Sequence, residues 1–352
     1  MKAKSPLKFA SLGLALFLAM SLYNCKPKET PFEVPDFNSG YKDVKLPDLT
    51  QTQPAAVTST PGSITASTTA TAASTGLASG TVTAAVTSTA TDIEKVVTPT
   101  EAGNLAAAFT PAVVNTMLSG GAIPTDLSAQ MKVIAADPAL AAYLPKVTNP
   151  SVNGVVVSGF IKETVLPGKD ADLPLITMPD FDVTDVTATP CTEAAANAFA
   201  AAKKILDDTK STQEKTVNDA YASRVAGANS ATCKSSATTA LTAAATAAKT
   251  KLDQQLAGLN TLLTNKTISQ NTYNLLSFFV YFDLYNSVVA ATGFYAATIK
   301  ACDVTADATI AAAKAAQTAD LAKIQTAYTT SLTGIQTKLN ADMKTCHDQG
   351  QG

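Results

Sequence analysis

The chain has 352 residues, with 26 Lys or Arg against 28 Asp or Glu, and its formal net charge at pH 7 is −2. This near balance, without a long basic run, excludes the electrostatic pattern of a nucleic-acid-binding protein, so we expect no nucleic-acid partner. The length is sufficient for one or two domains.

The N-terminus has the organisation of an export signal. Several lysines precede an uncharged stretch from Phe9 to Leu22, and a cysteine follows at Cys25. The apolar stretch is short for a membrane span, and it lies where a secretory signal peptide has its hydrophobic region. We therefore predict that residues 1–24 are a signal peptide that is removed on export.

The residues Leu22-Tyr23-Asn24-Cys25 resemble the lipobox that the lipoprotein signal peptidase recognises. A bulky or amide residue before the cysteine is similar to the relaxed lipoboxes of spirochaetal lipoproteins, and the resemblance covers only this N-terminal segment. It implies a diacylglyceryl thioether on Cys25, an acylated amino terminus and therefore a lipid anchor in a membrane. In the sorting rule of enteric bacteria, Lys26 after the cysteine favours the outer membrane. The sequence does not distinguish between the periplasmic face and the surface-exposed face of that membrane.

The segment 25–91 is expected to be the lipidated cysteine followed by a disordered tether. It is rich in Thr, Ala, Ser and Pro, and no charged residue occurs between Asp48 and Asp92. Such a composition provides too few large apolar groups to offset the entropy lost on ordering. Hydroxyl-rich segments with proline also occur in O-glycosylated stalks, and an unmodified spacer is the simpler interpretation.

Residues 92–190 are predicted to form a small mixed region that is mostly helical. Short helices are expected at 101–109, 111–118 and 124–136, because apolar residues recur there at helical spacing. Proline, which suits the first turn of a helix, begins two of them. A strand is expected at 153–161.

The segment from Leu166 to Pro190 contains four prolines and is expected to be extended. Within it, Asp180, Asp182 and Asp185 come nearest to a metal site, because carboxylate oxygens are ligands that Ca²⁺ prefers. The glycine that an EF-hand loop needs at its sixth position is absent. We therefore favour a solvated acidic loop over a calcium site.

The pattern changes at Cys191, after which the chain contains no proline. Proline disrupts helix interiors, so its absence over this length favours long helices, and apolar residues recur at intervals of three and four. The four predicted helices span residues 192–226, 232–263, 269–301 and 305–345. We expect an all-α C-terminal half in which residues 191–346 form a four-helix up-down bundle.

Four further cysteines, an even number in an exported chain, predict two disulfides. Each cysteine lies near the end of a predicted helix and in phase with its apolar residues. In the up-down bundle, one end brings Cys191 near Cys346, and the other end brings Cys233 near Cys302. Because a disulfide requires Cα atoms within about 7 Å, helices of this length exclude pairing between opposite ends.

The third predicted helix contains an aromatic-rich stretch, 275–299, with one charged residue, Asp283. Its length would suit a transmembrane helix, and the alternative is a buried central helix. We favour burial, because a bilayer would penalise Asp283 and Asn286 and a span would separate predicted disulfide partners. The sequence does not decide whether Asp283 faces Lys251, Lys323 or solvent.

Catalytic patterns are missing from the sequence. It has no nucleophile elbow, no phosphate-binding loop and no zinc-protease helix motif. The single histidine, His347, follows Cys346, and a Cys-His nucleophilic pair is a remote alternative because Cys346 is expected to be in a disulfide. We expect no catalytic residue and no cofactor.

These features predict a non-enzymatic lipoprotein that displays a disulfide-stapled helical bundle outside the cytoplasm. Its partners would be the membrane, through the lipid anchor, and a protein of the envelope or of a host. The alternative is a bundle that binds an apolar or lipid-like ligand along the aromatic third helix. An enzyme is disfavoured, because convergent ionisable groups are missing.

Overall fold

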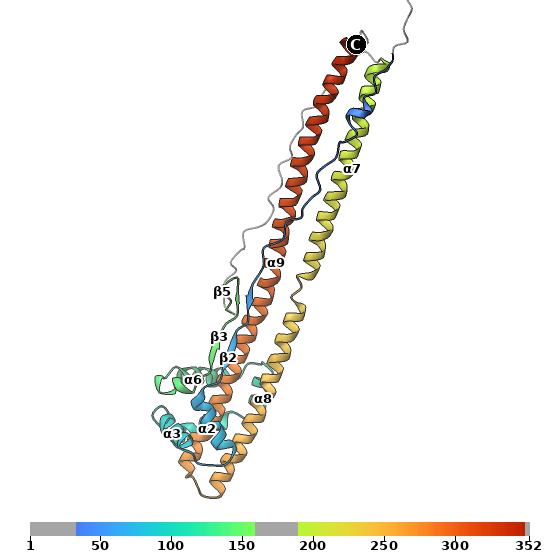
Figure 1. Ribbon diagram of the computed structural model, residues 1–352. Helices are drawn as coiled ribbons and strands as arrows, with labels where there is room; N and C mark the ends of the chain where they lie inside the picture. Colours follow the sequence, from blue (N-terminus) through green and yellow to red (C-terminus); the bar gives the residue numbers. More distant parts are fainter. Residues whose placement is uncertain (1–32, 159–188, 349–352) are drawn as a thin grey trace, which may run out of the picture. The chain divides into compact units, whose positions relative to one another are not determined.

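The computed structural model describes residues 33–158 and 189–348, which are mostly helical (Figure 1). The chain divides into two compact units, and the helices α7 (Pro190–Gly227) and α9 (Gln270–Asp348) contribute residues to both. Unit 1 comprises the described parts of Met1–Asp48, Ile176–Gln213 and Lys323–Gly352, and unit 2 those of Leu49–Leu175 and Glu214–Ala322.

Unit 2 contains a set of short helices. These are α2 (Thr68–Ala78), α3 (Ala84–Glu94), α4 (Pro99–Ala108), α5 (Pro111–Leu118), α6 (Thr125–Ala135) and the 3-10 helix η3 (Pro138–Tyr143). The first four begin after a serine or threonine whose side chain accepts a bond from a first-turn N–H, which satisfies a donor that the helix leaves unpaired. The helices α4, α5 and α6 confirm the three predicted short helices.

The prediction of a disordered tether is wrong for the residues that form α2 and the start of α3. In α2, Ala73 and Leu77 have no exposed surface, and Ile93 of α3 is 1% exposed. The carbonyl oxygen of Leu77 lies against Gly258 of α8 (Ala231–Thr264), where any added Cβ would collide with it. Small residues thus let the helices approach closely, and this packing offsets an ordering entropy that composition alone predicts to be too large.

Short antiparallel strands join two parts of unit 2 that are far apart in the sequence. Strand β4 (Ser151–Val152) pairs with β1 (Ser59–Thr60) and with β5 (Val155–Val156), and β2 (Ser63–Thr65) pairs with β3 (Lys146–Thr148). The strand predicted at 153–161 is therefore shorter than expected within the described residues. Its first two positions, Asn153 (φ 49°) and Gly154 (φ 78°), instead form the β4–β5 turn, whose left-handed conformations suit Asn and Gly.

The four-helix up-down bundle is not confirmed. The first two predicted helices correspond to α7 and α8, but the third and fourth are one continuous helix, α9. No proline or glycine lies between Ala301 and Thr305, so nothing in the sequence ends the helix there. The Thr305 hydroxyl donates a 2.8 Å bond to the carbonyl of Ala301 one turn earlier, so it does not cap a new helix.

The aromatic stretch of α9 is buried in unit 2, as predicted. Phe278 and Phe279 have no exposed surface and belong to a core formed with α2–α6 and the C-terminal half of α8. Asp283 is 7% exposed, and its Oδ2 atom lies 2.7 Å from Nζ of Lys251, which selects one of the three expected surroundings. Within the described part of the chain, α9 alone is long and apolar enough to cross a membrane, and 61% of its apolar window is buried in the protein.

Unit 1 is built on the N-terminal part of α7 and the C-terminal part of α9, which run antiparallel. The chain around the 3-10 helix η2 (Asn38–Gly40) packs on this pair through Phe37, Tyr41 and Leu46, all of which are buried. This contact corrects a further part of the predicted tether. Three large apolar side chains in a short stretch carry enough surface to order it.

Candidate functional site

The predicted lipidation site and the weak calcium candidates cannot be placed. Cys25 and the three aspartates Asp180, Asp182 and Asp185 lie outside the described residues. The remaining predicted site residues are the four cysteines, and the structure joins them in the two expected pairs.

One disulfide lies in each unit. Cys191 and Cys346 join in unit 1 with a Cα–Cα distance of 5.7 Å, and Cys233 and Cys302 join in unit 2 at 5.8 Å. The pairs are those predicted, but the basis differs, because Cys302 lies inside α9 and not at the end of a helix. In both units the bonded helices run antiparallel, as in the predicted bundle.

The unit 1 disulfide is enclosed. Cys191 and Cys346 have no exposed surface and belong to a core with Ala195 and Leu339. The disulfide therefore acts as a buried structural link between the first turn of α7 and the last turns of α9.

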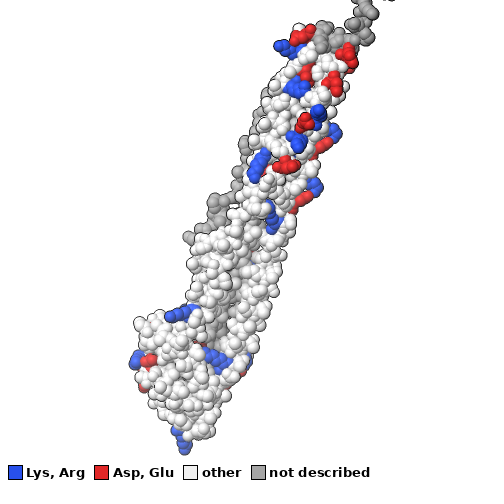
Figure 2. Space-filling view, viewed as in Figure 1, with Lys and Arg blue, Asp and Glu red and all other residues white. Residues whose placement is uncertain are grey.

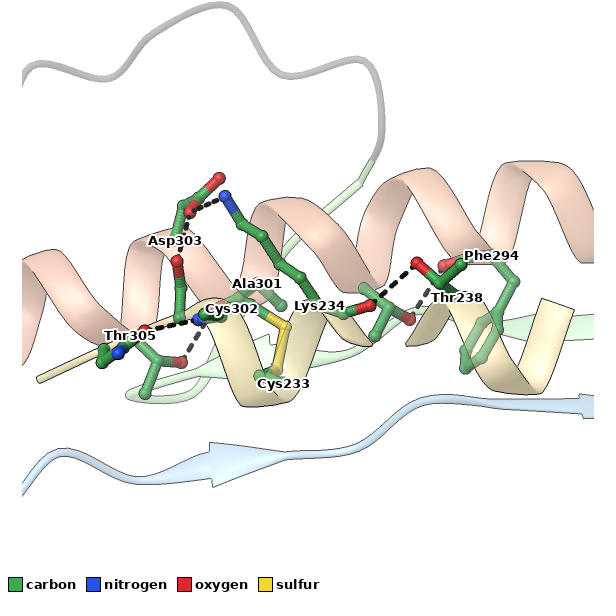
Figure 3. Close-up of a disulfide and its surroundings, with 12 residues drawn as sticks. Cys233, Lys234, Thr238, Phe294, Ala301, Cys302, Asp303 and Thr305 are labelled. Atoms are coloured by element: carbon green, nitrogen blue, oxygen red, sulfur yellow. Dashed lines mark hydrogen bonds and ion pairs between the residues drawn. A yellow bond between two sulfur atoms is a disulfide. The ribbon is translucent and has the colours of Figure 1, made fainter. Parts of the chain in front are cut away.

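The unit 2 disulfide has a different environment (Figure 3). Cys233 lies in the first turn of α8 and is exposed, whereas Cys302 is 3% exposed. Next to each cysteine in sequence stands one member of an ion pair, with Nζ of Lys234 2.6 Å from Oδ1 of Asp303. The Ser230 hydroxyl donates a 3.0 Å bond to the same Asp303 carboxylate. The hydrogen bond from Lys234 is the main cause that lowers the pKa of Asp303 below its usual range.

A pocket of about 310 Å³ lies beside this disulfide in unit 2. Cys233 and Cys302 both line it, and Pro61, Pro150 and Phe294 contribute apolar walls. Its remaining described lining comes from Ser59 and Gly62, from the residues around the α7–α8 connection and from neighbouring turns of α9. No ionisable side chain from residues 33–158 or 189–348 lines this pocket, and the disulfide is the redox-active group in that part of its lining.

A second pocket, of about 330 Å³, lies between α3 and the start of α9. Val86, Ala90 and Leu275 line it, and Glu94 is the one ionisable residue that the described part of the chain contributes to its lining. One carboxylate without an acid, base or nucleophile beside it does not make a catalytic set.

The sequence analysis missed three structural clusters that share one pattern. In each, a lysine pairs with an aspartate three or four residues away in the sequence, and a tyrosine hydroxyl from another segment donates to that aspartate. The clusters are Tyr41–Asp342–Lys338 and Tyr328–Asp207–Lys203 in unit 1 and Tyr143–Asp92–Lys95 in unit 2. Lys-Asp spacings of three or four were visible in the sequence, but the tyrosine partners depend on the fold.

These clusters shift the pKa values of their members. Burial and the hydrogen bond to Asp342 raise the pKa of Tyr41, and burial and the bond to Asp207 raise that of Tyr328. Burial acts to raise the pKa of Asp207, but hydrogen bonds from Lys203 and Tyr328 outweigh it and lower the pKa overall. The clusters link separate segments, and none lines either pocket.

Over residues 33–158 and 189–348, no group of three or more His, Cys, Asp or Glu side chains could hold a metal ion. His347 is exposed and lies beside Asp348, and its neighbour Cys346 is in a disulfide, so the described residues do not form a Cys-His pair. No family model, curated protein or solved structure matches this chain.

Proposed function

We propose that this protein is a non-enzymatic lipoprotein, anchored by a lipid on Cys25, that displays a disulfide-stapled helical scaffold outside the cytoplasm. The observation that carries the proposal is the presence of two disulfides, one in each unit. Disulfides persist in oxidising, extracytoplasmic compartments, which agrees with the export signal and the lipobox at the N-terminus. The outer membrane is the proposed location.

The described surface and pockets support a scaffold over an enzyme. Charged side chains of both signs alternate along α7 and the C-terminal part of α9 on the visible face, without a patch of one sign (Figure 2). Several charged side chains of α7 and α9 form Lys-Asp pairs one turn apart on the same helix, such as Lys204–Asp208. Mixed, paired charge suits a solvated scaffold, and the proposed partners are proteins of the envelope or of a host.

The alternative, an apolar ligand bound along the aromatic helix, has less support. Phe109 of the α4–α5 connection stacks on Tyr281 with ring centroids 5.0 Å apart, and Tyr143 of η3 meets Phe279 edge-on at 5.8 Å. The aromatic side chains therefore pack on the protein's own short helices. A ligand would have to displace those helices from the core of unit 2.

Metabolic labelling with an alkyne fatty acid tests the lipid anchor. The full chain, produced with its N-terminus in a bacterial host that lipidates exported proteins, should incorporate the label and partition into detergent. Cys25→Ser should lose both properties, because the thioether requires that sulfur. The matched control Lys26→Ala should stay labelled. Label on the Cys25→Ser protein, or none on the unchanged chain, would contradict the proposal.

Protease treatment of intact cells tests display toward the environment. Cleavage of this protein while a periplasmic control stays intact would support contacts with external proteins. Protection until the outer membrane is opened would place the scaffold in the periplasm and favour a role in envelope structure.

A further inference from the structure

We propose that the Cys233–Cys302 disulfide is a thiol–disulfide exchange site, whereas Cys191–Cys346 stays oxidised under the same conditions. Its reductant would be a small dithiol or a dithiol protein, and reduction would release the N-terminal part of α8 from α9. The inference concerns unit 2 alone and does not depend on the lipid anchor.

The first support is the difference in exposure between the two disulfides. Both cysteines of the unit 1 bond have no exposed surface, whereas Cys233 is exposed and only its partner Cys302 is buried. Exchange begins when a thiolate attacks a disulfide sulfur, so its rate depends on access to that sulfur. Access therefore favours the unit 2 bond and directs attack to Cys233.

The second support is the pocket beside this bond. Both cysteines line the volume of about 310 Å³, which also has Pro61, Pro150 and Phe294 in its wall. This volume gives a small reductant room next to the bond. Among the described residues, no carboxylate lines the pocket, so an incoming thiolate meets no negative side chain from that part of the chain.

The exchange can be written with its atoms and electrons balanced. One thiolate of the dithiol attacks Sγ of Cys233, the bond to Cys302 breaks, and Cys302 Sγ leaves with the electron pair and takes a proton from water. The second thiolate of the reductant then attacks the reductant's own sulfur in the mixed disulfide and releases Cys233 as a thiolate, which also takes a proton from water. The protein gains two electrons and two protons, and the dithiol becomes a disulfide.

The consequence follows from the burial along α8. Ala237 is the only buried residue of this helix before Leu252, so apolar packing holds its N-terminal part weakly. Three other contacts help: the Lys234–Asp303 ion pair, the 3.0 Å hydrogen bond from Ser230 to Asp303, and a 3.4 Å contact between the hydroxyls of Thr238 and Tyr295. All three involve partly exposed side chains, and such contacts are weak. The disulfide is therefore the main link, and its loss should favour local opening.

Mass-spectrometric mapping of reduction tests the site. The full chain in detergent is treated with dithiothreitol for increasing times, quenched with acid, alkylated and digested. Cys233 and Cys302 should be alkylated on the order of tenfold faster than Cys191 and Cys346, and in denaturant the two rates should converge. Equal rates in the folded protein, or faster reduction of Cys191–Cys346, would overturn the proposal.

Glutathione, a monothiol, tests the direction of attack. The trapped mixed disulfide should be on Cys233, with Cys302 as the free thiol. Ala306→Phe, which adds a ring at the pocket wall, should slow reduction several-fold, whereas Ala311→Phe, at an exposed position of α9 outside the pocket, should not. Glutathione found on Cys302, or equal rates in both variants, would contradict attack from the pocket.

Limited trypsin digestion tests the structural consequence. Reduced protein should be cleaved after Lys234 faster than oxidised protein, while the C-terminal half of α8 stays protected by its buried residues. The double variant Cys233→Ser/Cys302→Ser should behave like reduced protein without reductant. If neither the reduced protein nor the variant is cleaved faster there, the bond does not hold this segment.

Discussion

At the scale of single residues, contact between helices in unit 2 depends on the missing side chain of Gly258. A Cβ there would meet the carbonyl oxygen and carbon of Leu77 in α2, which are backbone atoms that cannot rotate away. Glycine in a helix interior is otherwise unfavourable by about 1 kcal/mol relative to alanine. Its presence in α8 is explained by the close approach of α2.

Gly258→Ala should therefore lower the free energy of unfolding by about 1–3 kcal/mol, because the two helices must move apart. Denaturant unfolding followed by circular dichroism measures this change. Gly293→Ala is the matched control in α9, since no atom lies within 4 Å of its added Cβ, and it should be neutral or stabilising. A neutral Gly258→Ala would mean that α2 does not pack on α8 in this way.

The Tyr328 hydroxyl, 2.6 Å from Asp207, gives a second prediction at this scale. Tyr328→Phe should cost about 0.5–1.5 kcal/mol of stability. A stability loss at the lower end of this range is expected, because the Asp207 side chain is 43% exposed. Carboxyl NMR should show that the pKa of Asp207 moves toward its ordinary value. Tyr295→Phe, which loses a longer 3.4 Å contact, should change stability less.

At the scale of elements, the continuity of α9 is the main difference from the predicted bundle. Cysteine positions and apolar spacing were compatible with a break at residues 302–304, and only the absence of proline and glycine opposed it. In the structure, Asp303 does not cap a new helix. Its carboxylate is bonded to Ser230 and Lys234 of the neighbouring segment.

Val304→Pro distinguishes the continuous helix from the broken one. Proline suits the first turn of a helix but disrupts an interior, so a chain that breaks at 302–304 would tolerate it. In the continuous α9, the variant should lose about 3 kcal/mol or more relative to Val304→Ala, which controls for the lost side chain. Thermal unfolding of both variants measures the difference, and equal stability would support the broken helix.

At the scale of the whole molecule, the sequence predicts local features better than packing partners. The helices α4, α5 and α6 could be expected, because threonine or proline marks their starts and apolar residues recur within them. The helices α2 and α3 could not, because few large apolar residues mark them, and α2 packs on a surface at Gly258 that is distant in the sequence. The cysteine pairs were predicted correctly, because the predicted bundle and the structure both place each pair on antiparallel neighbouring helices.

The pH dependence of stability combines both units and both signs of shift. The pKa values of Asp92, Asp207 and Asp303 are lowered in the folded protein, so the stability that these carboxylates contribute is present above their ordinary range near about 4. That stability is lost as pH falls through the lowered values. The pKa values of Tyr41 and Tyr143 are raised, so their contribution is present below about 10 and lost as pH rises toward the raised values.

The melting temperature of the oxidised protein should therefore be nearly constant between about pH 4 and pH 10 and should fall at lower and at higher pH. Asp207→Asn should lower the melting temperature near neutral pH. It should also make the fall of the melting temperature at acid pH less steep, because one of the groups that titrates there is removed. Tyr41→Phe should likewise make the fall of the melting temperature at alkaline pH less steep, while it leaves the fall at acid pH unchanged. A melting temperature that rises as the pH falls below about 4 would contradict the lowered carboxyl pKa values, because protonation would then favour the folded state.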